Sequence, residues 1–279
     1  MNLELEKKVA LITGSSQGLG FASAWALAGE GCRVCICGRD ENRLKRASEK
    51  LEARAGGSDC ILAVQADLTN VEDIAMVVTQ TVEKFGGVDV LVNNSFDFSP
   101  KTGFNDPSGR IENISKETFM KGLESGIYWP LHCTQVVGKR MIEQKYGNIV
   151  NITSLYASLV ADYRMYEGRD VFNPVTYPVS KHGLVGLTKY IASFWAPHGI
   201  RCNCLSPGSF PNTTSKKDDP SAPNSVEDDE FLNILNRKCS LGRTGVPKDL
   251  ESAIQFLCSE KSSYLTGANL LVDGGWSVL

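Results

Sequence analysis

A tyrosine and a lysine stand four residues apart in the segment Tyr177-Pro178-Val179-Ser180-Lys181. If this segment is helical, the two side chains share one face of the helix and nearly touch. A free phenol titrates near pH ~10 and exchanges protons poorly at neutral pH. A neighbouring ammonium favours the phenolate and lowers the pKa of the phenol, so this pair could act as an acid and base. The alternative for such a pair by itself is an exposed Tyr and Lys on an amphipathic helix.

A glycine-rich segment near the start of the chain could bind phosphate. The segment Thr13-Gly14-Ser15-Ser16-Gln17-Gly18-Leu19-Gly20 follows an apolar run and precedes an amphipathic one. Glycines let a backbone approach a pyrophosphate, and the start of a helix supplies N–H donors and the positive end of its dipole. We expect cofactor contacts from Gly14, Ser16, Gln17, Gly18, Leu19 and Gly20.

The elements that must position these residues follow from the alternation of short apolar runs with longer amphipathic segments, which is typical of a parallel sheet covered by helices. The sequence predicts a single α/β domain over residues 1–279, a Rossmann-type doubly wound parallel sheet of about seven strands flanked by helices. The expected strands are Val9–Thr13, Arg33–Cys37, Ile61–Gln65, Val88–Asn93, Asn148–Thr153, Arg201–Ser206 and Asn269–Val272. The expected helices are Leu19–Ala28, Glu41–Ala53, Val71–Phe85, Lys116–Gln144, Tyr177–Ala196, Glu230–Asn236 and Pro247–Cys258.

Two insertions, residues 155–176 and 209–240, interrupt this alternation. Each follows a predicted strand at its carboxyl end, where ligands bind in open α/β sheets. We therefore expect both insertions to border the substrate. Arg164 or Arg169 could bind a phosphate or carboxylate, and a surface flap is the alternative.

Composition excludes several functional classes. The 279 residues carry a formal net charge of -3, which argues against a nucleic-acid binder. No stretch approaches the ~20 apolar residues that cross a bilayer, and the start of the chain does not resemble a signal peptide, so we expect a cytoplasmic protein. The nine cysteines lack metal-ligand spacing, and we expect buried thiols in a reducing compartment and no metal.

The order of these motifs resembles the short-chain dehydrogenase/reductase family over essentially the whole length. The resemblance implies a nicotinamide cofactor, a homotetramer or homodimer, and a small-molecule substrate. It also implies that Ser154 hydrogen-bonds the substrate oxygen, that Tyr177 exchanges the proton, and that Lys181 lowers the tyrosine pKa and binds the nicotinamide ribose. The matching segments are Thr13–Gly20, Asp67-Leu68-Thr69, Asn93-Asn94, Asn148–Ser154, Tyr177–Lys181, Ile200–Gly208, Leu241–Arg243 and Leu265–Gly275. Further expected cofactor contacts are Asp67, Leu68, Asn94, Tyr177, Lys181, Pro207 and Gly208.

The residues after the second predicted strand bear on the choice of cofactor. An acidic side chain at the position of Gly38 would bind the ribose hydroxyls of NAD and repel a 2′-phosphate. Gly38 removes that acid, and Arg39 offers a guanidinium that could bind the phosphate. We therefore expect NADP(H) in preference to NAD(H). The alternative is that Arg39 is a solvated residue beside Asp40.

Three departures from the family pattern concern the active site. Ser154 and Tyr177 stand 23 positions apart, which is about ten more than usual in the family. Ser95-Phe96 replaces the usual Ala-Gly after Asn93-Asn94. Gly126, with Ser125 beside it, takes the position of an asparagine that helps to hold a water next to the lysine. We expect slower or differently relayed proton transfer.

The predicted function is an NADP(H)-dependent oxidoreductase that interconverts a secondary alcohol and a ketone. The segments Ile200–Gly208 and Tyr163–Gly168 resemble family members from bacterial surface-sugar and flagellin-modification pathways, which implies a polar substrate, a sugar or a sugar derivative. A 3-oxoacyl-type reductase is an alternative within the same family. A non-catalytic NADP(H)-binding sensor or partner protein is the alternative of another class.

Overall fold

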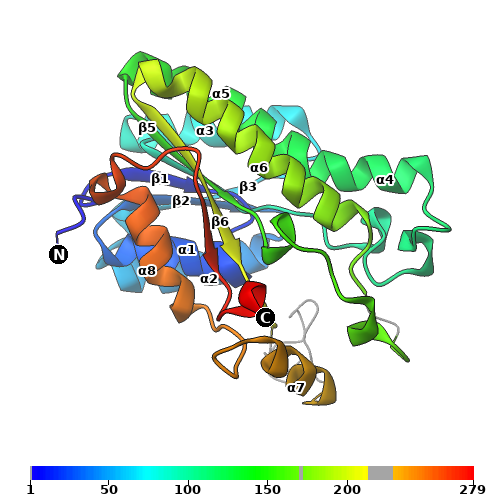
Figure 1. Ribbon diagram of the computed structural model, residues 1–279. Helices are drawn as coiled ribbons and strands as arrows, with labels where there is room; N and C mark the ends of the chain where they lie inside the picture. The colour runs from blue at the N-terminus through cyan, green and yellow to red at the C-terminus, as the bar shows by residue number, and fades with distance from the viewer. Residues whose placement is uncertain (1, 170–171, 213–228) are drawn as a thin grey trace.

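Seven parallel strands form one sheet in the part of the chain that the computed structural model describes, residues 2–169, 172–212 and 229–279. The order across the sheet is β3-β2-β1-β4-β5-β6-β7, with a crossover between β1 and β4 that makes the fold doubly wound (Figure 1). The predicted Rossmann-type α/β fold is confirmed. The strands are β1 (Val9–Ile12), β2 (Arg33–Gly38), β3 (Ile61–Gln65), β4 (Val90–Asn93), β5 (Gly147–Ile152), β6 (Ile200–Pro207) and β7 (Asn269–Val272).

Helices cover both faces of the sheet (Figure 1). One face carries α1 (Gly18–Gly29), α2 (Glu41–Ala55) and α8 (Lys248–Cys258). The other carries α3 (Val71–Phe85), α5 (Trp129–Gln144) and α6 (Thr176–Trp195). Two further helices, α4 (Lys116–Leu123) and α7 (Asp229–Lys238), lie toward the carboxyl edge of the sheet. No helix in these described ranges is long and apolar enough to cross a membrane.

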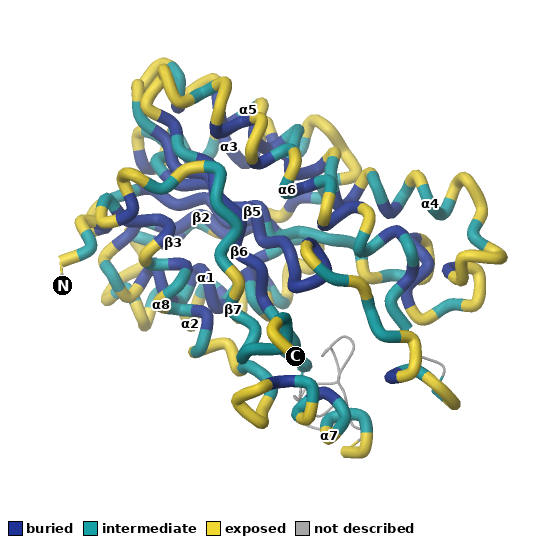
Figure 2. The backbone as a smooth tube through the Cα atoms, in the orientation of Figure 1, coloured by how far each residue is buried: buried dark blue, intermediate teal, exposed yellow. Residues whose placement is uncertain are grey.

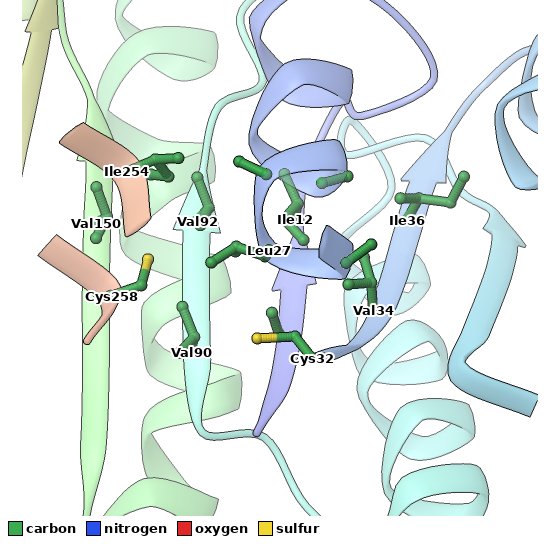
Figure 3. Packing of buried hydrophobic residues seen from close by; sticks show 14 of the residues in the cluster. Ile12, Leu27, Cys32, Val34, Ile36, Val90, Val92, Val150, Ile254 and Cys258 are labelled. Carbon is green, nitrogen blue, oxygen red and sulfur yellow. The ribbon is translucent and has the colours of Figure 1, made fainter. Parts of the chain in front are cut away.

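The strands are apolar on both faces because both faces are covered. Figure 2 shows the central strands as buried along most of their length. On one face Ile12, Val92 and Val150 pack against Leu27 of α1 and Ile254 of α8 (Figure 3). The alternate strand residues Leu11, Leu91 and Ile149 pack on the opposite face against Val77, Val137 and Ile191. Two apolar layers therefore hold the carboxyl edge of the sheet in a fixed arrangement.

The single helix predicted over Lys116–Gln144 is interrupted by a π-turn, Glu124–Tyr128, between α4 and α5. The Trp129 N–H bonds to the Glu124 carbonyl five residues back. Pro130 follows immediately, and because proline has no N–H it cannot continue the ordinary helical ladder there. The π-turn places Gly126 against α6.

Candidate active site

Ser154, Tyr177 and Lys181 come together at the carboxyl edge of the sheet. Ser154 follows β5 with extended backbone, and its Oγ accepts the Tyr156 N–H at 3.1 Å. Tyr177 lies in the first turn of α6, one turn before Lys181, and the Ser154 hydroxyl is near enough to its phenol to favour the phenolate. The 23 positions between Ser154 and Tyr177 therefore do not separate them in space.

The Lys181 ammonium is enclosed by the fold, and the residue is only 4% exposed. Its Nζ donates to the Ile152 carbonyl at 3.0 Å. It lies 5.1 Å from the centroid of the Phe96 ring and 5.6 Å from that of the Tyr177 ring, within cation–π range of both. Burial lowers the pKa of Lys181 to about 8, since few polar groups replace the lost hydration.

The pKa of the Tyr177 phenol is shifted in the direction opposite to the expected one. Burial raises the pKa of Tyr177 to about 12 and outweighs the effect of the Ser154 hydroxyl, which lowers it. The ammonium of Lys181 is hydrogen-bonded to the Ile152 carbonyl and lies over the ring faces. Desolvation is therefore the stronger influence on the phenol in the protein without cofactor.

Aromatic side chains surround this phenol and account for its desolvation. The centroids of Phe96 and Phe104 both lie 5.2 Å from that of Tyr177. Phe98 is 5.9 Å away and Tyr156 is 6.3 Å away. The three phenylalanines, called the phenylalanine cluster below, come from the long connection after β4. Sequence reasoning singled out Phe96 alone; three phenylalanines within nine residues were the available signal.

The glycine-rich loop between β1 and α1 has the geometry that a pyrophosphate needs. Gly14 and Gly18 have φ of +61° and +57°, a region that favours glycine. A Cβ on Gly20 would collide with the Asn94 amide. Gln17 precedes α1 without capping it through its side chain, and the first helical N–H groups are thus available to an anion. The chain therefore fits a dinucleotide at this loop.

Asn94 holds the loop in place. Its Nδ2 donates to the carbonyls of Thr13 and Gly14, at 3.0 Å each, and its own N–H donates to the Thr13 hydroxyl at 3.0 Å. Both the side-chain amide and the backbone N–H of Asn94, a predicted cofactor residue, thus donate to groups of the protein itself. A direct contact between Asn94 and cofactor stays a prediction.

The end of β2 lies beside the same loop. A Cβ on Gly38 would lie 3.3 Å from Ser16 Oγ. Asp40 is engaged elsewhere, because it caps α2 through the Arg43 N–H at 2.9 Å and pairs with the Arg43 guanidinium at 3.6 Å. Arg39 is exposed, and no hydrogen bond or ion pair of its guanidinium is found in the described part of the chain.

The remaining predicted cofactor residues lie at carboxyl ends of strands. The Asp67 carboxylate accepts the Thr69 N–H at 3.0 Å in the turn that follows β3, with Leu68 between them. Pro207 ends β6, and the Gly208 N–H bonds to the Val272 carbonyl at 2.9 Å. Within the described ranges no group of three metal-ligating side chains is found.

Comparison with known proteins identifies the family. A family model described as enoyl-(acyl carrier protein) reductase matches residues 14–277. Human dehydrogenase/reductase SDR family member 4 is 31% identical over 97% of this chain and 88% of its own. The chain belongs to the short-chain dehydrogenase/reductase family.

Other family members with similar chains act on diverse substrates. L-rhamnose 1-dehydrogenase (NAD(P)(+)) of Azotobacter vinelandii is 34% identical over 96% of both chains. The solved NADPH-dependent 3-quinuclidinone reductase of Rhodotorula rubra has a TM-score of 0.80 and 26% identity, covering 100% of this chain and 94% of that one. Family membership makes this protein an alcohol and ketone oxidoreductase with a nicotinamide cofactor.

This family member differs from the expected pattern at Gly126. A Cβ there would lie 2.5 Å from Ser180 Oγ and 3.0 Å from the edge of the Phe96 ring. The volume of a side chain at position 126 is therefore already occupied. Ser125 next to it is fully buried, and its hydroxyl bonds to the Gly122 carbonyl at 3.3 Å.

The two arginines of the first insertion are both paired. Arg164 binds the Asp162 carboxylate at 2.8 and 2.9 Å, and Lys238 of α7 binds the same carboxylate at 2.9 Å. Arg169 pairs with Glu230 of α7 at 3.1 Å. These contacts match the surface-flap interpretation and join the insertion to α7. Of the second insertion, residues 213–228 lie outside the described ranges.

Proposed function

We propose that the protein is an NADP(H)-dependent oxidoreductase that interconverts a secondary alcohol and a ketone on a polar small molecule, a sugar or a sugar derivative. The observation that carries the proposal is the convergence of Ser154, Tyr177 and Lys181 beside the glycine-rich loop. A non-catalytic sensor would have no need of a phenol and an ammonium buried together at that place.

Each of the three side chains has the role in this proposal that the family resemblance implies. NADP(H) supplies or accepts the hydride when it is bound. The Ser154 hydroxyl donates a hydrogen bond to the substrate oxygen, where negative charge develops during reduction. The Tyr177 phenol delivers its proton to that oxygen in reduction and takes a proton from it in oxidation. The Lys181 ammonium stabilises the phenolate and binds the ribose next to the nicotinamide.

The preference for NADP(H) rests on Gly38 and Arg39. Position 38 has no acid to repel a 2′-phosphate. Asp40 could have paired with Arg39, but it pairs with Arg43 instead.

The experiment that tests the preference compares kcat/KM for NADPH and NADH. Arg39→Ala should raise KM for NADPH about tenfold and leave KM for NADH nearly unchanged, because only NADPH carries the phosphate. Arg140→Ala, an exposed arginine on α5, serves as the control. Equal efficiency with both cofactors in the parent protein would refute the preference.

The sugar substrate is supported by the relative that acts on L-rhamnose and by the resemblance of Tyr163–Gly168 to surface-sugar enzymes. A screen of ketoses, aldoses and nucleotide sugars, followed by nicotinamide absorbance, tests it. Turnover of 3-oxoacyl thioesters in preference to sugars would favour the 3-oxoacyl-type reductase. Tight NADPH binding without turnover of any ketone or alcohol would favour the sensor.

A homotetramer or homodimer is supported by exposed apolar side chains on two elements. Tyr190 and Phe194 stack at 4.2 Å on the outer face of α6 and are 58% and 60% exposed. Val278 and Leu279 are exposed at the carboxyl end. Light scattering after gel filtration tests this proposal, and a monomer at micromolar concentration would refute it.

A cytoplasmic location is supported by the nine free cysteines. Export of the protein into the periplasm or the culture medium would contradict this location.

A further inference from the structure

Phe98 presents an aromatic face to solvent directly beside the Tyr177 phenol. Its side chain is 45% exposed, whereas Phe104 behind it is only 7% exposed. The centroid of the Phe98 ring lies 4.9 Å from that of Phe96, 5.0 Å from that of Phe104 and 5.9 Å from that of Tyr177. The phenylalanine cluster thus supports Phe98 from within and leaves it open on the outer side. Exposed aromatic surface that is held in this way is typical of a binding surface.

The connection that carries Phe98 is anchored to the helix that carries Tyr177. The Thr176 hydroxyl donates to the Thr102 carbonyl at 2.9 Å. The Thr102 hydroxyl in turn donates to the Asp97 carbonyl at 2.7 Å, one residue from Phe98. A chain of two hydrogen bonds therefore runs from the residue before Tyr177 to the residue before Phe98. This arrangement fixes the ring relative to the phenol before any ligand binds.

The Asp97 carboxylate next to Phe98 and the charged side chains of the first insertion have partners within the chain. The Asp97 carboxylate accepts the Ser99 N–H at 3.0 Å. Arg164 and Lys238 both bind the Asp162 carboxylate, as described above. A ligand that approaches the phenol past Phe98 therefore meets an aromatic face with which C–H groups pack favourably.

We propose that Phe98 is a specificity-determining residue whose ring packs against the C–H face of a cyclic alcohol or ketone. The inference rests on the proposed function and narrows its substrate class to compounds that react in ring form. A rigid ring can cover the Phe98 face without losing rotamers, whereas an open chain of the same size must be ordered on binding. Pyranose sugars and alicyclic alcohols both present such a face.

The experiment uses two pairs of alcohols with NADP+ as oxidant. One pair is apolar, cyclohexanol and 2-hexanol, and the other is polar, a 6-deoxyhexose and its alditol. The ring or open form tests the role of Phe98, while the polar or apolar pair tests the sugar proposal. We expect Phe98→Ala to raise KM about tenfold for the ring compounds and to leave KM for the open-chain compounds and for NADP+ unchanged.

Two further variants distinguish a loss of packing between Phe98 and the substrate ring from a general disruption of the connection after β4. Phe98→Leu keeps an apolar surface and should raise KM for the ring compounds by less than Phe98→Ala. Ile111→Ala removes an exposed apolar side chain, 77% exposed, from the same connection and should change none of these constants. An equal rise in KM for ring and open-chain compounds, or no rise for either, would overturn the inference.

Failure of the proposed function gives a different result. If the parent protein oxidises none of the four alcohols, calorimetric titration of cyclohexanol into the NADP+-loaded protein decides the matter. Weaker binding to Phe98→Ala than to the parent protein would support the role of Phe98 although the function is wrong. Equal binding, or none, would overturn both.

Discussion

The ring of Phe96 occupies the space that a side chain on Gly126 would need. The missing Cβ would lie 3.0 Å from Phe96 Cε2, and Phe96 also faces the Lys181 ammonium at 5.1 Å. The small residue in the π-turn therefore makes room for the large residue after β4. The apolar ring of Phe96 thus lies next to the position where the family pattern predicts an asparagine that holds a water. Restoring asparagine at position 126 alone would test packing and not proton transfer.

Gly126→Ala should destabilise the protein. The added Cβ would lie 2.5 Å from Ser180 Oγ on α6, and overpacking of this kind typically costs about 1–3 kcal/mol. Gly186→Ala on α6 is the matched control, because a Cβ there meets nothing within 4 Å and alanine favours a helix by about 0.5–1 kcal/mol. Denaturant unfolding measures both. An unchanged free energy of unfolding for Gly126→Ala would contradict the packing argument.

Phe96→Ala should lower the pKa of Tyr177 and raise that of Lys181. Both shifts arise from burial, and removing the ring admits water to the phenol and the ammonium. Alcohol oxidation requires the phenolate, so its rate should rise at lower pH than in the parent protein. The pH profile of oxidation measures this, with Phe85→Leu at the carboxyl end of α3 as a control. A profile that stays in place or moves to higher pH would refute the role of the ring.

Lys181→Met should stabilise the protein at neutral pH while abolishing turnover. The pKa of Lys181 falls from 10.5 to about 8 on folding, so the unfolded chain binds more protons between those values. The charged lysine therefore opposes folding fully below pH ~8, and the penalty is relieved as pH rises toward 10.5. Its size is on the order of 3 kcal/mol. Unfolding at pH 7 and pH 10 should show a gain for Lys181→Met that shrinks at the higher pH.

The exposed Lys189 on the same helix supplies the control for that experiment. Lys189→Met should leave both the stability and its pH dependence within about 0.5 kcal/mol of the parent protein. A destabilised Lys181→Met variant would show that the contact with the Ile152 carbonyl outweighs the burial of the charge.

Tyr177→Phe should reduce kcat by about 10²–10⁴-fold, the range in which positioned acid–base groups contribute. The ring and its contacts with the phenylalanine cluster remain, so NADPH should bind with unchanged Kd. Nicotinamide fluorescence measures binding, and single-turnover absorbance measures the chemical step. Tyr190→Phe, an exposed tyrosine on the same helix, should behave as the parent protein. An active Tyr177→Phe variant would show that another group carries the proton.

The fold could be predicted from the sequence because each strand is an apolar run covered on both faces. Most predicted boundaries lie within two residues of the observed ones, and Val71–Phe85 matches in full. The π-turn in Lys116–Gln144 was missed, although Pro130 was its signal. It depends on a hydrogen-bond register that apolar periodicity does not report.

The site could be predicted only as far as its motif extends. Ser154, Tyr177 and Lys181 do lie together, as their order in the chain implied. The direction of the Tyr177 pKa shift was wrong, because it depends on Phe98 and Phe104, which reach the phenol from a distant connection. The anchoring of the loop by Asn94 likewise follows from spatial contacts between β1 and β4.

Both oxygens of the Asp162 carboxylate accept hydrogen bonds from Arg164, and one of them also accepts from Lys238, 76 positions further along the chain. Together with the pair of Arg169 and Glu230, this makes the first insertion and α7 a single module. A chimaera that receives only one of the two segments would inherit unmatched charges. A chimaera that exchanges the first insertion and α7 together would keep these ion pairs intact.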